Sequence, residues 1–128
     1  MISKEARRAI DAWLGKYPPT ERRSAVLAAL RIVQEENGGW LTVELMDEVA
    51  DYLGIPKVAV YEVATFYSMF DLKPTGRHKI SICTNICCML MGAEAIVEHV
   101  ERRLGIRLGE TTPDGRITLK VEEECLAA

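Results

Sequence analysis

The stretch Lys79-Ile80-Ser81-Ile82-Cys83-Thr84-Asn85-Ile86-Cys87-Cys88 joins an alternating apolar pattern to three closely spaced cysteines. Residues 78–82 alternate as a β-strand does, and the apolar positions of residues 89–104 recur at helical spacing. After a turn, residues 116–121 alternate again, which predicts a second strand. Strand, helix and strand in this order predict a βαβ unit, with parallel strands and a right-handed crossover.

The cysteines stand at the ends of these elements. Cys83 follows the first strand, Cys88 immediately precedes the helix, and Cys125 follows the second strand. Parallel strands end at one edge of the sheet, and open α/β sheets bind ligands at that edge, so we expect three thiolates to converge there. The helix start adds amide donors and a positive dipole end, which favour an anionic metal centre.

Three thiolates do not complete a site, because a [2Fe-2S] cluster and structural zinc each usually take four ligands. We expect Cys87 not to be the fourth, since adjacent residues point their side chains apart. A lone βαβ unit also leaves sheet edges and one face uncovered. We therefore expect either that the chain is truncated at its C-terminus, before a cysteine that pairs with Cys125, or that a partner protein covers the gap.

The first half of the chain predicts four helices. Thr20 is placed to cap the second helix, whose predicted apolar face is Val26, Leu27, Leu30 and Val33. The third helix is expected to begin at Thr42 and to end at Gly54.

A fourth helix is predicted for residues 58–70, buried on most sides and central to a helical bundle. Its aromatic residues Phe66, Tyr67 and Phe70 are expected in the bundle core. The pattern then breaks at residues 73–76. This break divides the chain into a helical bundle at 1–75 and an α/β domain at 76–128, an α+β fold.

Composition excludes several classes of function. The chain has 128 residues with 16 Lys and Arg against 19 Asp and Glu, and no basic stripe that would bind nucleic acid. No export signal is evident at the N-terminus, and the most apolar stretch is too short to cross a bilayer, which argues against direct membrane insertion. Four cysteines in an unexported, cytoplasmic protein favour ligands or redox thiols over disulfides.

Several ordered motifs resemble those of one family: residues 60–70, 73–76, 83–90, 92–94, 104–106, 109–115 and 124–126. Together they resemble the 24 kDa, E-type subunits of complex I, NADH:quinone oxidoreductase. This resemblance implies that the second domain is a thioredoxin-like ferredoxin domain, apparently incomplete, binding one [2Fe-2S] cluster. It also implies that Cys83, Cys88 and Cys125 are metal ligands, with Cys87 as an extra thiol and the fourth ligand just beyond Ala128.

The resemblance further implies a partner subunit that carries FMN and the NADH site, next to a neighbouring iron-sulfur subunit. The cluster would take an electron from the flavin, and NADH chemistry would belong to the partner. Such a chain would lie in the peripheral arm of a membrane-bound complex, on the cytoplasmic side. Thr84, Asn85 and the amides around Met89 are candidate hydrogen-bond donors to the cluster.

Other interpretations remain open. Closely related subunits serve NAD-linked formate dehydrogenases and hydrogenases, and a scaffold without a cluster would also retain these motifs. A zinc or thiol-redox domain is disfavoured because the spacing is not Cys-x-x-Cys. The single histidines His78 and His99 favour surface or packing roles, and the acidic run 122–124 is equally well explained as a solvated turn.

Overall fold

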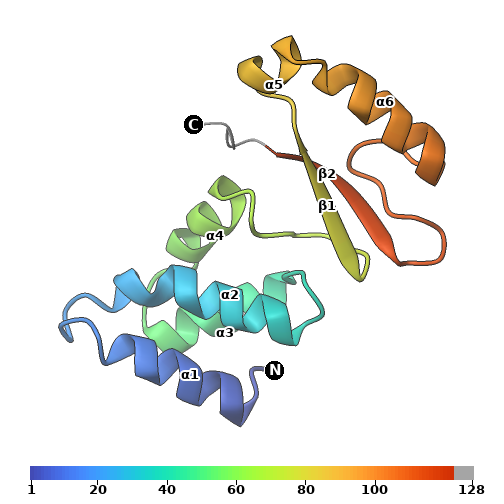
Figure 1. Ribbon diagram of the computed structural model, residues 1–128. Coiled ribbons are helices and arrows are strands. Elements are labelled where there is room, and N and C mark those ends of the chain that lie inside the picture. Colours follow the sequence, from blue (N-terminus) through green and yellow to red (C-terminus); the bar gives the residue numbers. More distant parts are fainter. Residues whose placement is uncertain (123–128) are drawn as a thin grey trace. The chain divides into compact units, whose positions relative to one another are not determined.

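The computed structural model describes residues 1–122, which fall into two compact units, one ending at Pro74 and one beginning at Thr75. The first unit consists of helices, and the second contains two parallel strands with helices (Figure 1). The mixed α+β class predicted from the sequence is therefore confirmed at this level.

Helix α1 (Lys4–Leu14) begins at a serine cap and buries one apolar face. The Ser3 hydroxyl accepts a hydrogen bond from the Ala6 amide at 3.0 Å, and so provides a partner for one of the amides that a helix start leaves without one. Ala6 and Ile10 are buried and lie four residues apart, on the same face of the helix.

Helix α2 (Val26–Glu36) begins later than predicted. A 3-10 turn, Arg22–Ala25, precedes it, so Thr20 does not cap this helix. The Arg22 guanidinium donates to the carbonyl of Leu53 at 2.8 Å, which fastens the turn to the end of another helix.

The buried face of α2 also differs from the predicted one by one residue. Val26, Leu30 and Val33 are buried as predicted, but Leu27 is 40% exposed and Ala29 is buried instead. Positions 26, 29, 30 and 33 share one side of a 3.6-residue helix, and this is the side that packs against the core.

Helix α3 (Val43–Leu53) begins and ends as predicted. The Thr42 hydroxyl accepts a hydrogen bond from the Leu45 amide at 3.1 Å. Gly54, with a φ of 68°, ends the helix in the left-handed conformation that glycine adopts without steric cost.

Helix α4 (Lys57–Phe66) is shorter and more exposed than predicted. Only Ala59, Val60 and Ala64 are buried on it, while Val58 and Phe66 are mostly exposed. The prediction of a central helix buried on most sides and running to Phe70 was therefore wrong.

The chain leaves α4 because Gln34 of α2 holds the segment that follows. The buried Gln34 side chain donates to the carbonyl of Met69 at 3.0 Å and accepts from the amide of Asp71 at 2.9 Å. These bonds pair backbone groups that a continued helix would pair internally. Phe70 is thereby buried, whereas Phe66 stays exposed, so the expected aromatic core was wrong for Phe66.

One continuous hydrophobic core joins the four helices of the first unit. Its large, fully buried members come from α1, α2, the loop before α3, α3 and α4: Ile10, Val26, Leu30, Val33, Leu41, Val49, Leu53 and Val60.

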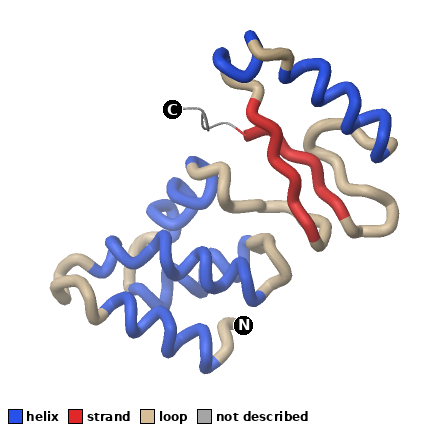
Figure 2. Tube along the Cα trace, viewed as in Figure 1, coloured by secondary structure: helices blue, strands red, loops and turns tan. Residues whose placement is uncertain are grey.

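Strands β1 (His78–Cys83) and β2 (Ile117–Glu122) pair in parallel, as the βαβ interpretation predicts (Figure 2). The register places Cys83 opposite Glu122. Beside β2, the amide of Leu119 donates to the carbonyl of Glu110 at 3.0 Å. The loop before β2 therefore covers the edge of that strand.

Two helices, rather than the single predicted helix, connect the strands. Helix α5 (Ile86–Leu90) is separated from α6 (Ala93–Leu104) by Gly92, which has a φ of 94°. The predicted helix from Met89 to Leu104 was wrong in its first turn, because Gly92 allows the chain to change direction there.

No helix among residues 1–122 is both long enough and apolar enough to cross a membrane.

Candidate metal centre

Cys83 is the last residue of β1 and one of the few buried side chains of the second unit. It stands at the carboxyl end of the strand, where the sequence places it, and it is held there by the parallel pairing with β2. Burial at this edge is compatible with a metal ligand. It is equally compatible with a small apolar side chain that only packs in the core.

Cys87 and Cys88 lie within α5 rather than ahead of the connecting helix, which corrects the predicted position of Cys88. Cys87 is exposed and Cys88 is half-buried. Successive residues of a helix point about 100° apart, which accounts for the difference.

The short length of α5 changes the expected electrostatics. A five-residue helix has only one turn of aligned peptides, so the dipole expected at the start of a long helix is not available here. The amide of Met89 donates to the carbonyl of Asn85 at 2.8 Å. That amide is thus engaged within the helix, contrary to the expectation that it faces a metal centre.

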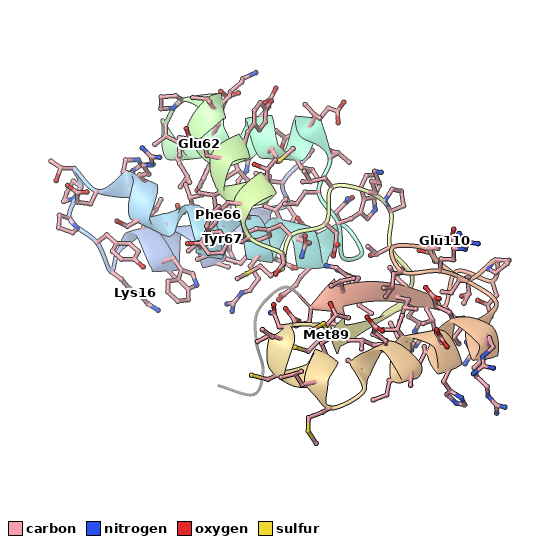
Figure 3. The ribbon with its side chains drawn as sticks, turned by 90° about the horizontal axis from the view of Figure 1, so that it is seen from above. Lys16, Glu62, Phe66, Tyr67, Met89 and Glu110 are labelled. Carbon is pink, nitrogen blue, oxygen red and sulfur yellow. The ribbon has the colours of Figure 1, made fainter. Side chains whose placement is uncertain are left out.

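Exposed apolar residues flank Cys87 and Cys88 in the chain. Ile86, Leu90 and Met91 are 68%, 78% and 87% exposed, and Met89 also lies on α5 (Figure 3). The other buried hydrophobic residues described in this unit are Ala93, Ile106 and Leu119.

The described residues supply two of the three predicted ligands. Cys83 and Cys88 come from the carboxyl end of β1 and from the helix that follows it, while Cys125 lies outside the described residues. Within residues 1–122, no three His, Cys, Asp or Glu side chains are grouped as a metal site would need. Thiols fit iron or zinc in the kind of donor, but the two described cysteines do not by themselves complete a site for either metal.

Gly76 and Thr118 position β1, and nothing in the sequence pattern indicated either role. The Gly76 amide donates to the hydroxyl of the buried Thr118 at 2.5 Å, and Thr118 also shares a hydrogen bond of 2.7 Å with Thr111. A Cβ at Gly76 would lie 2.9 Å from backbone atoms of Ile117. Only glycine permits this close approach at the start of the strand that carries Cys83.

The turn before β2 is fixed by a charged aspartate. The Thr112 hydroxyl donates to the Asp114 carboxylate at 2.5 Å and the Arg116 amide donates at 3.1 Å. These bonds hold the pKa of Asp114 below its usual 3.8, the Thr112 bond contributing most. The turn that precedes the second strand is therefore held by one hydrogen bond from a side chain and one from the backbone, both to the same carboxylate.

His78 and His99 are both exposed. Neither belongs to a group of three potential ligands within the described part of the chain.

The sequence matches a known family and its curated members. The family described as thioredoxin-like [2Fe-2S] ferredoxin matches residues 10–128. An E-type subunit of NADH-quinone oxidoreductase, form 2, from Rhizobium meliloti (strain 1021) is 49% identical over 122 residues, which cover 95% of this chain and 70% of that protein.

Two further relatives extend the similarity. The E-type subunit of NADH-quinone oxidoreductase from Rickettsia conorii (strain ATCC VR-613 / Malish 7) is 48% identical over 88% of this chain and 67% of that protein. NADH dehydrogenase [ubiquinone] flavoprotein 2, mitochondrial, of Dictyostelium discoideum is 44% identical over 93% of this chain and 48% of that protein.

Proposed function

This chain belongs to the thioredoxin-like [2Fe-2S] ferredoxin family and is a homologue of the E-type subunits of NADH-quinone oxidoreductase, and we propose that it is the electron-transfer subunit of such an enzyme. The observation that carries the proposal is a buried Cys83 at the carboxyl end of β1, followed by Cys88 on the next helix, α5, inside the range that the family matches.

Four thiolates are proposed to hold the cluster. Cys83 and Cys88 form the first pair and Cys125 begins the second, with the fourth ligand supplied from beyond Ala128 in the intact gene product. Glu122 lies opposite Cys83 in the strand register, and only two residues separate it from Cys125 in the sequence. This supports Cys83 and Cys125 as ligands of one centre.

When bound, a [2Fe-2S] cluster supplies one-electron transfer at a potential that depends on burial, charge and hydrogen bonding around it. The protein's part is to hold the thiolates and to limit access of water. The burial of Cys83 limits access of water to that thiolate. The exposed thiol of Cys87 is proposed not to bind iron.

The partners follow from this function. The electron comes from the FMN of a partner subunit, which also binds NADH and carries out the hydride chemistry, and it is passed on within an assembly that includes a neighbouring iron-sulfur subunit. We place the chain in the peripheral arm of the enzyme, on the cytoplasmic side of the membrane.

The test is to purify the intact gene product anaerobically with its flavin-carrying partner and to measure iron content, visible absorption and EPR. The proposal predicts two iron atoms per chain, the number that defines a [2Fe-2S] cluster, and an EPR signal that appears when NADH is added. A colourless protein that contains zinc would overturn it. A cluster that dithionite reduces but NADH does not would contradict the flavin as electron donor.

A further inference from the structure

A groove lies open on the helical unit, away from the predicted ligands. It encloses about 290 Å³ between the end of α1, one face of α2 and Met69. Its lining includes Trp13 on α1, Tyr17 in the segment that follows α1, and Leu27 and Arg31 on α2. We call it the α1–α2 groove.

The lining is mainly apolar and only partly covered. Leu27 is 40% and Met69 is 52% exposed, while Trp13 and Tyr17 are half-buried. Leu27 is the residue that the helical periodicity places in the core and that the structure leaves at the surface. Aromatic residues, methionine and arginine are enriched where proteins meet, and apolar side chains gathered in a groove indicate a binding surface more strongly than scattered ones.

The charges at this groove have one sign. Arg31 is its charged lining residue, and the Lys16 ammonium stands 3.6 Å from the centre of the Trp13 ring (Figure 3). Neither cation forms an ion pair with another of residues 1–122. An acidic side chain, Glu35, lies one turn beyond Arg31 on α2 but outside the lining.

The dimensions suit a helix. The lining positions run from Ser24, in the 3-10 turn before α2, to Arg31 on α2, which is about 10 Å at 1.5 Å per residue, or two turns of a helix lying in the groove. A second copy of this chain is a poor occupant, because a symmetric contact would bring each Lys16 and Arg31 towards its own equivalents.

We propose that the α1–α2 groove binds an acidic amphipathic helix of another subunit of the same enzyme. Its apolar side chains fill the space between Leu27, Trp13 and Met69, and its carboxylates pair with Lys16 and Arg31. The inference rests on the proposed function for the identity of the assembly, whereas the groove itself does not depend on the metal centre.

A site-specific cross-link tests the occupant. The photoreactive amino acid benzoylphenylalanine replaces Leu27 in the intact gene product within the assembled enzyme, and Val58, which is 61% exposed outside the groove, is the control position. We expect a cross-link from position 27, and not from position 58, to an acidic amphipathic segment of another subunit. A cross-link to a second copy, to this chain itself or to nothing in the intact assembly would overturn the proposal.

Charge reversal tests the cations. The double variant Lys16→Glu with Arg31→Glu competes with the wild type for incorporation into the enzyme. The control Lys4→Glu with Arg8→Glu makes the same change of charge on α1, outside the groove. We expect the groove variant to be under-represented about tenfold, which corresponds to about 1.4 kcal/mol, and the control to stay near parity. Equal incorporation of the two variants would overturn the proposed pairing.

The two proposals fail in distinguishable ways. An enzyme without the cluster EPR signal but with the position 27 cross-link refutes the electron-transfer function alone. An enzyme with the signal and without that cross-link refutes the docking surface alone.

Discussion

The helical unit buries side chains from four helices in one core, whereas the described part of the cysteine-bearing unit buries only a few around two strands. In the second unit, Ile86, Leu90 and Met91 remain more than half exposed. A two-stranded sheet with so small a core is marginal by itself. The difference indicates that the first unit is stabilised by its own packing. For the second unit we expect that the metal–thiolate bonds of the proposed centre add stability that its packing does not supply.

Removing iron is expected to produce the largest difference in stability between the two units. Metal binding can supply on the order of 10 kcal/mol of folding free energy to a small domain, so chelation is expected to abolish hydrogen-exchange protection in β1 and β2. The amides of α2 and α3 should keep theirs. Exchange of the intact gene product before and after chelation measures both units at once, and unchanged protection of the strands would contradict the account.

A cavity in the core of the helical unit is expected to lower the free energy of unfolding by less than removal of iron does in the second unit. This loss should be the same with and without iron. Leu30 is fully buried, and Leu30→Ala is expected to lower the free energy of unfolding by about 2–5 kcal/mol. Leu27→Ala on the same helix, at a 40% exposed position, should change it by less than about 1 kcal/mol. Denaturant titration with and without iron compares the two, and equal losses would place Leu27 in the core after all.

Gly76→Ala tests the start of β1. The added methyl would lie 2.9 Å from the backbone of Ile117, and relieving such a contact is expected to cost about 1–3 kcal/mol. Gly15→Ala is the control in the helical unit, because its nearest atoms would be 3.6 Å away. Thermal unfolding followed by circular dichroism compares the two variants. An unchanged midpoint for Gly76→Ala would show that the backbone near Ile117 moves aside without loss of stability.

The smallest effect is expected from the ion pair between α3 and α4. The Lys57 ammonium donates to Asp47 at 2.7 Å and the Tyr61 hydroxyl donates to its other oxygen. Hydrogen bonding to Lys57 first, and then to Tyr61, holds the pKa of Asp47 below its usual 3.8. The charged carboxylate therefore stabilises the helical unit above that pH, and this contribution is lost as the pH falls through the lower folded value.

Asp47→Asn should remove that part of the acid dependence. Urea midpoints of the helical unit between about pH 5 and pH 2 are expected to fall less steeply in the variant than in the wild type. Parallel curves would mean that the exposed pair contributes nothing measurable.

Local chemistry explains what could be predicted from the sequence. Thr42 and Gly54 bound α3 because a cap and a left-handed glycine act within one turn. The parallel strands followed from alternation on both sides of a helical pattern. Cys83 could be placed at the end of β1 because the alternating pattern stops there, whereas Cys88 lies within α5 and not ahead of the connecting helix.

Long-range contacts explain what could not be predicted. Gln34 ends α4 from another helix, and no pattern within residues 57–70 contains that information. Leu27 and Phe66 have the right period for a core, but which side of a helix is covered depends on its neighbours. Gly92 lies at a break between two helices, and the spacing of the apolar residues did not indicate this break. Convergence of Cys125 with the other thiols stays a prediction, since that residue lies outside the described part.

The most direct test of the metal centre compares three single substitutions in the anaerobically purified intact gene product: Cys83→Ser, Cys88→Ser and Cys87→Ser. The quantity to measure is the EPR signal of the dithionite-reduced protein per chain. The account predicts that the first two lose the signal of the bound cluster and that Cys87→Ser retains it. Equal loss in all three, or a full signal without Cys83, would contradict it.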